Sequence, residues 1–160
     1  MRRASLHSGF TLIEVLVYLA LFALIMTGGL SGYHAITETS QANSAESRLT
    51  REGMFIEDRI VFRMRTSTNI LSPLNTASTT ALTVSSTTPL TLSVVQSVFS
   101  ETQSTPLPLT DSSITASSVS FSLHPVPSGS MLVYAFSLSM RDGAGRLHTI
   151  PFSGSLFRSL

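Results

Sequence analysis

The chain of 160 residues contains no cysteine and no lysine, and only 12% of its residues are charged, against about 25% in ordinary soluble domains. Without cysteine there is no disulfide framework, no thiolate nucleophile and no cysteine-based metal site. Without lysine no glycine-rich loop can end in the ammonium group that holds a phosphate. The formal net charge of +1 gives no basic surface for duplex DNA, so we expect no nucleic acid partner.

Catalytic patterns are also missing. The four histidines lie scattered at positions 7, 34, 124 and 148, with no carboxylate beside them in the sequence, and there is no Gly-x-Ser-x-Gly sequence. Asp111 and Asp142 are too dispersed among the few acids to predict a calcium site. We therefore expect no catalytic residues, no metal ligands and no cofactor, and nothing in the sequence supports an enzyme.

Hydroxyl side chains supply most of the polarity that is present. The chain has 28 serines and 19 threonines, and 28 of these hydroxyl residues fall between residues 66 and 122. That region carries two acids, Glu101 and Asp111, and no base. We interpret it as a neutral outer surface that can lie beside other subunits without strong charge repulsion.

An apolar run of 21 residues follows the short amino-terminal leader, from Phe10 to Leu30. As a helix it is about 32 Å long, enough to cross a bilayer. Arg2 and Arg3 precede the run, and the first acid after it is Glu38. The positive-inside rule therefore predicts a single-pass protein with its amino end in the cytoplasm and its carboxyl end outside.

Glu14 interrupts this apolar run. A carboxylate inside the membrane costs on the order of 3 kcal/mol, so it needs a positively charged or hydrogen-bonding partner. No basic residue lies within the run itself, which leaves no helical neighbour there to serve. The partner must come from a new amino terminus or from another chain.

The sequence G-F-T-L-I-E-V-L at Gly9–Leu16, after an arginine-bearing leader, resembles the amino-terminal signature of type IV pilins and of the pseudopilins of type II secretion. The resemblance implies that a prepilin peptidase cuts between Gly9 and Phe10 and methylates the new amine of Phe10. It also implies that Glu14 pairs with the terminal amine of a neighbouring subunit during assembly. Residues 1–9 are then a leader, and residues 10–32 form the membrane and assembly half of a long helix.

The same resemblance implies a structural subunit of a type IV pilus-like filament or a type II secretion pseudopilus. Its partners are then the prepilin peptidase, other pilins or pseudopilins, the membrane and, indirectly, an assembly platform and its ATPase. We expect storage in the bacterial inner membrane and a periplasmic or extracellular filament after assembly. The absence of a cysteine pair and the run T-R-E-G-M-F-I-E-D-R-I-V-F-R-M-R at Thr50–Arg65, similar to J-type minor pseudopilins, favour a minor subunit.

Other readings stay open at this point. A cleaved secretory signal peptide and an ordinary signal anchor share the basic start and the apolar run, but both leave Glu14 unexplained. A third alternative is a filament-tethered binding module for DNA, a surface or a secreted substrate, in which Arg141, Arg146 and Arg158 form a small basic patch. Three charges supply little affinity for DNA.

Beyond the membrane, residues 33–66 predict an amphipathic helix half. Leu49, Ile56, Ile60 and Met64 recur at helical spacing with Gly53 between them, and the charged residues of this half are predicted to form a solvated or subunit-facing surface. We expect one helix from about Phe10 to Thr66, flexible near Gly28, Gly29 and Gly32 because each glycine costs about 1 kcal/mol in a helix. The predicted core residues are Phe55, Ile56, Ile60 and Phe62.

Residues 67–160 predict an antiparallel sheet domain, which makes the fold class α+β. Apolar residues alternate with polar ones in four runs, which lie at 82–84, 90–94, 119–123 and 132–140. Asp142-Gly143 predicts a hairpin with a four- or five-residue loop before a strand at 147–152, and Pro151 predicts that this strand is an edge or ends early. Pro106 and Pro108 are expected to break regular structure.

Overall fold

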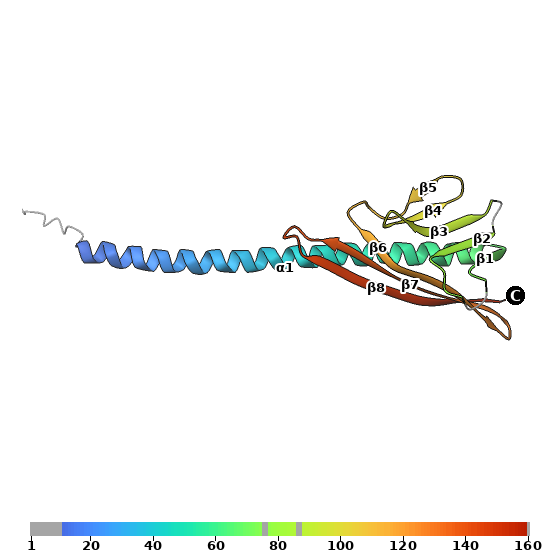
Figure 1. Ribbon diagram of the computed structural model, residues 1–160. Coiled ribbons are helices and arrows are strands. Elements are labelled where there is room, and N and C mark those ends of the chain that lie inside the picture. The colour runs from blue at the N-terminus through green and yellow to red at the C-terminus, as the bar shows by residue number, and fades with distance from the viewer. Residues whose placement is uncertain (1–10, 75–76, 86–87, 160) are drawn as a thin grey trace, which may run out of the picture. The chain divides into compact units, whose positions relative to one another are not determined.

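The structure, a computed structural model, describes residues 11–74, 77–85 and 88–159. Contacts divide the chain into two compact units, Met1–Ser40 and Gln41–Leu160. The described residues form one helix and eight strands: α1 (Leu12–Thr66), β1 (Asn69–Ser72), β2 (Ala81–Ser85), β3 (Leu90–Val95), β4 (Val98–Thr102), β5 (Pro106–Pro108), β6 (Thr115–Val126), β7 (Gly129–Arg141) and β8 (Leu147–Ser159). A long amino-terminal helix with antiparallel sheets confirms the predicted α+β, pilin-like class (Figure 1).

Helix α1 is 55 residues long and contains no proline. Nothing in this stretch removes a backbone donor, and Gly28, Gly29 and Gly32 are all helical. Arg63 and Arg65 lie in the last turn, where positive charge is favoured by the helix dipole. The predicted single helix is confirmed, while the expected flexibility at the three glycines stays a prediction.

One stripe of α1 in the second unit is buried. It comprises Ala45, Leu49, Gly53, Ile56, Ile60 and Met64, spaced by three or four residues. The prediction of Ile56 and Ile60 as core residues is confirmed. The prediction of Phe55 and Phe62 was wrong, because both side chains are 50% exposed. At 100° per residue they lie on the side of the helix away from the buried stripe.

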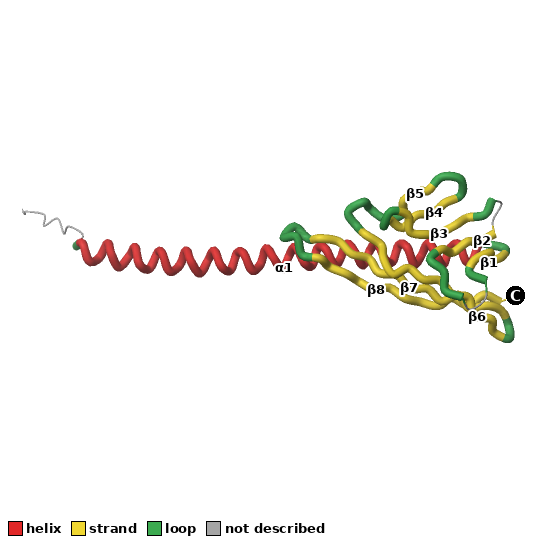
Figure 2. The backbone as a smooth tube through the Cα atoms, viewed as in Figure 1, coloured by secondary structure: helices red, strands yellow, loops and turns green. Residues whose placement is uncertain are grey.

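The eight strands make two antiparallel sheets (Figure 2). Strands β1 to β5 pair in sequence order in one sheet, and β6, β7 and β8 form the other. All four predicted alternating runs lie on strands. Apolar side chains from both sheets and from the buried stripe of α1 form one core, with Phe99, Phe121 and Phe136 its largest fully buried members.

Of the two proline predictions, the one for Pro106 and Pro108 was wrong and the one for Pro151 is confirmed. Pro106 and Pro108 were expected to break regular structure, but they form the short strand β5, which pairs with β4 at the edge of its sheet. Proline is tolerated there because its missing donor can face away from the neighbouring strand. Pro151 lies in β8, which is an edge strand as predicted and continues to Ser159.

Two glycines let aromatic side chains approach the backbone closely. A Cβ on Gly53 would lie 2.0 Å from the ring of Phe152, and that ring stacks on Phe136 with centroids 5.1 Å apart. A Cβ on Gly154 would lie 2.4 Å from the hydroxyl of Tyr134. The first contact fastens α1 to the β6–β8 sheet and explains why a helix interior contains glycine at position 53, whereas the second lies between β7 and β8 within that sheet.

Candidate assembly site

Glu14 lies in the first turn of α1. Its backbone N–H donates to the carbonyl of Thr11 at 3.1 Å and to the Thr11 hydroxyl at 3.4 Å. The sequence Thr-Leu-Ile-Glu has the spacing of a capping box, in which a threonine hydroxyl accepts from the third residue of the helix. The side chain of Glu14 is exposed and has no ion pair among the described residues, so its carboxylate is available to a group from outside this helix.

The helix around Glu14 exposes almost only apolar side chains. An 18-residue window of α1 has a mean hydropathy of 2.1 and no buried residue. Two hydroxyls of this segment donate to carbonyls of the helix itself, Thr27 to Ala23 at 2.6 Å and Ser31 to Gly28 at 2.9 Å. Polar groups satisfied in this way suit a lipid environment, and by length and composition the segment can cross a membrane.

Gly9 and Phe10 lie outside the described residues. Cleavage between them and methylation of Phe10 therefore stay predictions. Phe10 precedes Glu14 by four residues, about 6 Å along a helix.

The second unit contains a buried ion cluster that sequence reasoning missed. Glu101 on β4 is 5% exposed. It accepts hydrogen bonds from Arg59 Nε at 2.6 Å and from Arg63 Nη2. The prediction of a solvated or subunit-facing surface is wrong for these two arginines, because both pair with Glu101 of the same chain and their side chains are only 30% and 20% exposed. The only sign of this cluster in the sequence was Glu101 itself, a single acid among serines and threonines.

Other polar contacts join α1 to a loop and to a strand of the second unit. Arg48 pairs with Asp111 at 2.7 Å. A hydrogen bond from the backbone of Ser113, helped by Arg48, lowers the pKa of the Asp111 carboxyl. Tyr134 on β7 donates to Glu57 Oε1 at 3.2 Å. Burial, and then the charge of Glu57, raise the pKa of Tyr134 to about 12.

His148 contacts the carboxylate of Asp142, which lies six residues away and so was not recognised from the sequence. Its Nε2 lies 3.0 Å from Asp142 Oδ2 in the β7–β8 turn. The other oxygen of Asp142 accepts backbone N–H groups of Ala144 and Arg146 at 2.9 Å. The bond with His148, followed by these backbone donors, lowers the pKa of Asp142. The predicted Asp-Gly hairpin loop is confirmed, and this pair closes it.

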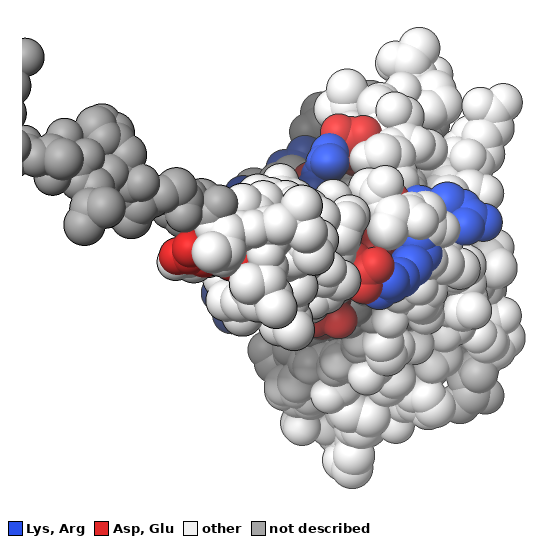
Figure 3. Space-filling view, turned by 90° about the vertical axis from the view of Figure 1, so that its left-hand side faces the viewer, with Lys and Arg blue, Asp and Glu red and all other residues white. Residues whose placement is uncertain are grey.

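The described residues show no cluster that could hold a metal ion, since no group of three histidines or acids comes together among them. The suggested basic patch is also divided. Arg141 and Arg146 lie at the β7–β8 turn, whereas Arg158 lies at the far end of 13-residue β8, roughly 40 Å away. Arg158 donates to the Thr68 carbonyl. Most of the surface visible in Figure 3 is uncharged.

A family profile, the prokaryotic N-terminal methylation motif, matches residues 5–30. No curated protein and no solved structure matches the chain. The motif points to a structural subunit rather than an enzyme, and it implies processing by prepilin peptidase and assembly with other pilins. The apolar helix fits membrane anchoring. The chain thus carries the amino-terminal methylation motif that is characteristic of type IV pilins and pseudopilins, on a pilin-like α+β fold.

Proposed function

We propose that this chain is a minor pilin or pseudopilin that is cut after Gly9, methylated on Phe10 and stored in the inner membrane with its amino end in the cytoplasm. Extraction into a filament then packs the apolar helices of neighbouring subunits together. The exposed Glu14 carboxylate on an otherwise apolar helix is the observation that carries the proposal. In lipid this charge is costly, and a neighbour's terminal ammonium relieves the cost only after assembly.

The minor role rests on two further features. The chain has no cysteine to close a carboxyl-terminal loop. The two acids of the hydroxyl-rich region 66–122 are both paired with arginines of α1, Glu101 with Arg59 and Arg63, and Asp111 with Arg48. The hydroxyl-rich sheet is therefore left with little free charge, which suits close contact with other subunits.

The test replaces Glu14 with alanine in the full chain. Because the cleavage residues are unchanged, we expect normal removal of the leader but at least a tenfold loss of the protein from sheared or isolated filaments, which corresponds to about 1.4 kcal/mol or more. Glu46→Ala, which removes an exposed carboxylate from the second unit, is the matched control and is expected to assemble normally. Normal incorporation of Glu14→Ala would contradict the pairing.

A further inference from the structure

Strand β8 has one open edge. It pairs with β7 along its whole length and is the last strand of its sheet. The N–H of Asp142 donates to the carbonyl of Arg146 just before β8, and the register continues from there without a bulge. The even-numbered residues of β8 therefore bond to β7, and the odd-numbered ones direct their N–H and carbonyl groups away from it. Among the described residues, no other backbone bond reaches these outward groups.

The open edge is unprotected over residues 153–159. Natural sheets shield their edges with lysine, proline or a bulge, because an unpaired edge is a template for another strand. Pro151 has no N–H and blocks the edge at its own position. Beyond it there is no lysine, proline or bulge for about 20 Å of strand. This part of β8 can therefore accept an added strand.

A cavity of about 400 Å³ lies between this edge and the last turns of α1. Its apolar lining comes from Val61 and Met64 of α1 and from Leu156 and Phe157 of β8. A strand added to β8 would alternate its side chains between the two faces of the sheet. The side chains on the face toward α1 would enter the cavity.

Two arginines and no acid line this cavity. Arg65 is exposed and takes part in no ion pair among the described residues. Arg158 donates to the Thr68 carbonyl and the Ser67 hydroxyl, which are both uncharged. Asp58, the acid closest to Arg65 in the sequence, lies about 10.5 Å from it along the helix axis. The cavity therefore has an excess of positive charge that a carboxylate can neutralise.

The ion cluster of the same unit shows how this chain satisfies two arginines. There the single carboxylate of Glu101 binds both Arg59 and Arg63. Arg65 and Arg158 line one cavity without such an acid. A carboxylate from another molecule would do for this second pair what Glu101 does for the first.

The spacing along the cavity defines the segment that fits it. Val61 and Arg65 lie about 6 Å apart along α1, and Leu156 and Arg158 about 6.8 Å apart along β8. Residues two apart on an added strand also lie about 6.8 Å apart and share one face. An apolar residue and an acid separated by one residue thus reach the apolar and the cationic parts of the cavity together.

We propose that β8 and the end of α1 form a binding groove for an extended, acidic segment of another protein. The segment adds as a strand beside residues 153–159, where main-chain hydrogen bonds supply affinity. Its aspartate or glutamate lies between Arg65 and Arg158, and an apolar residue two positions away packs against Val61 and Leu156. The groove belongs wholly to the second unit, so this binding function goes beyond the proposed filament role and does not depend on Glu14.

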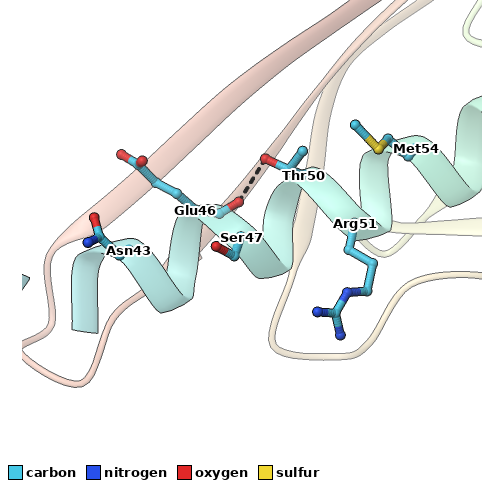
Figure 4. Close-up of a pocket in the computed structure, with 6 residues that line it drawn as sticks. All are labelled: Asn43, Glu46, Ser47, Thr50, Arg51 and Met54. Atoms are coloured by element: carbon cyan, nitrogen blue, oxygen red, sulfur yellow. Dashed lines mark hydrogen bonds between the residues drawn. The ribbon is translucent and has the colours of Figure 1, made fainter. Parts of the chain in front are cut away.

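A hollow on α1 provides an internal comparison. It is lined by helix residues alone, which are Asn43, Glu46, Ser47, Thr50, Arg51 and Met54 (Figure 4). An acid and an arginine both line it, so it has no excess of positive charge, and it offers no strand edge. Arg51 is exposed and, like Arg65, takes part in no ion pair among the described residues. It is therefore the matched control for Arg65.

The test titrates the peptide Thr-Val-Thr-Asp-Thr-Val-Thr into the full chain in mild detergent. The peptide reads the same in both directions, so it offers an apolar residue two positions from its acid in either orientation. Because the chain has no lysine, an amine-reactive dye labels only its amino terminus, and thermophoresis then follows binding. We expect a Kd below about 1 mM. Replacing the aspartate with asparagine, or exchanging it with a neighbouring threonine so that it lies on the opposite face, should weaken binding at least fivefold.

Variants of the chain test each part of the groove. Arg65→Gln should weaken binding of the aspartate peptide at least threefold, and Arg51→Gln should leave it unchanged. Ser155→Pro removes an outward N–H without removing a bond to β7 and should abolish binding; thermal unfolding shows whether this variant is folded. The natural chain gives a second test of strand addition. N-methylation of alternate peptide residues, in one set and then the other, should abolish binding for one set only, because only alternate residues face β8.

Four results would overturn the proposal. The first is no binding of the aspartate peptide with a Kd below about 1 mM. The second is equal binding when the acid lies on the opposite face, which would mean that only an anion is recognised. The third is equal binding of both N-methylated peptides, and the fourth is equal binding by Arg65→Gln. None of these results bears on removal of the leader or on Glu14, so failure of the groove leaves the proposed filament function standing.

Discussion

Removal of the Glu101 carboxylate is the sharpest test of what holds the second unit together. Glu101→Ala leaves Arg59 and Arg63 without their shared partner, and one Arg63 nitrogen, Nε, is already buried without a hydrogen bond. Breaking a buried ion pair by removing one partner costs about 3–5 kcal/mol. Because the two arginine side chains are 30% and 20% exposed and can turn partly into water, we expect the lower end, about 3 kcal/mol.

The measurement is pulse proteolysis of the full chain in mild detergent across a urea series, which reports the free energy of unfolding of the second unit. A matched control is Arg48→Ala, which breaks the exposed Arg48–Asp111 pair, 46% and 45% exposed, and should cost less than about 1 kcal/mol. A second control replaces all three charges, with Arg59→Met, Arg63→Met and Glu101→Leu, and should recover most of the loss. A loss below about 0.5 kcal/mol for Glu101→Ala would refute the assignment of the cluster as a structural fastener.

Three further outcomes are expected. Gly53→Ala should destabilise the second unit by about 1–3 kcal/mol despite the better helix propensity of alanine, because its Cβ would lie 2.0 Å from the Phe152 ring. Thermal unfolding measures this change, and a stabilised variant would contradict it. Ser97→Gly should stabilise by roughly 1 kcal/mol, since Ser97 occupies the β3–β4 turn at φ 64°; an unchanged urea midpoint would contradict it. The pKa of Asp142 is lowered, so its contribution to stability is present above about pH 4 and is lost as pH falls through the lowered value. Asp142→Asn should therefore flatten the acid side of the profile of unfolding free energy against pH. An unaltered profile would argue against the His148 contact.

Much of the second unit followed from local patterns in the sequence. The alternation of apolar residues in β7 and the Asp142-Gly143 turn identified strands and a hairpin, because each depends on neighbours along the chain. The buried stripe of α1 was equally visible at Leu49, Ile56 and Ile60. Phe55 and Phe62 were misjudged because size and hydrophobicity were weighed before their angular position on the helix.

Contacts between distant parts of the chain escaped prediction. Glu101 lies 42 residues from Arg59, and no spacing rule connects an acid in a strand with a helix arginine. The pairing of His148 with Asp142 depends on the curl of the turn rather than on adjacency. The strand β5 was missed because Pro106 and Pro108 normally signal a loop, and only the sheet edge makes them acceptable.

The assembly site was more accessible to sequence reasoning than the fold. A carboxylate in an apolar run is costly wherever the run lies, so Glu14 was identified from chemistry alone. The described residues add that it is exposed, that its backbone is capped by Thr11 and that no ion pair there satisfies it. The partner that we propose, the terminal amine of a neighbouring subunit, lies on another chain, which a single sequence cannot display.

Mass spectrometry of the mature amino terminus, on full-length protein recovered from the membranes of the cells that make it, tests the central claim most directly. The account predicts a chain that begins at Phe10 and carries a methyl group on its terminal amine. A chain that begins at Met1, or one cut near Gly32 as a secretory signal peptide would be, would contradict it.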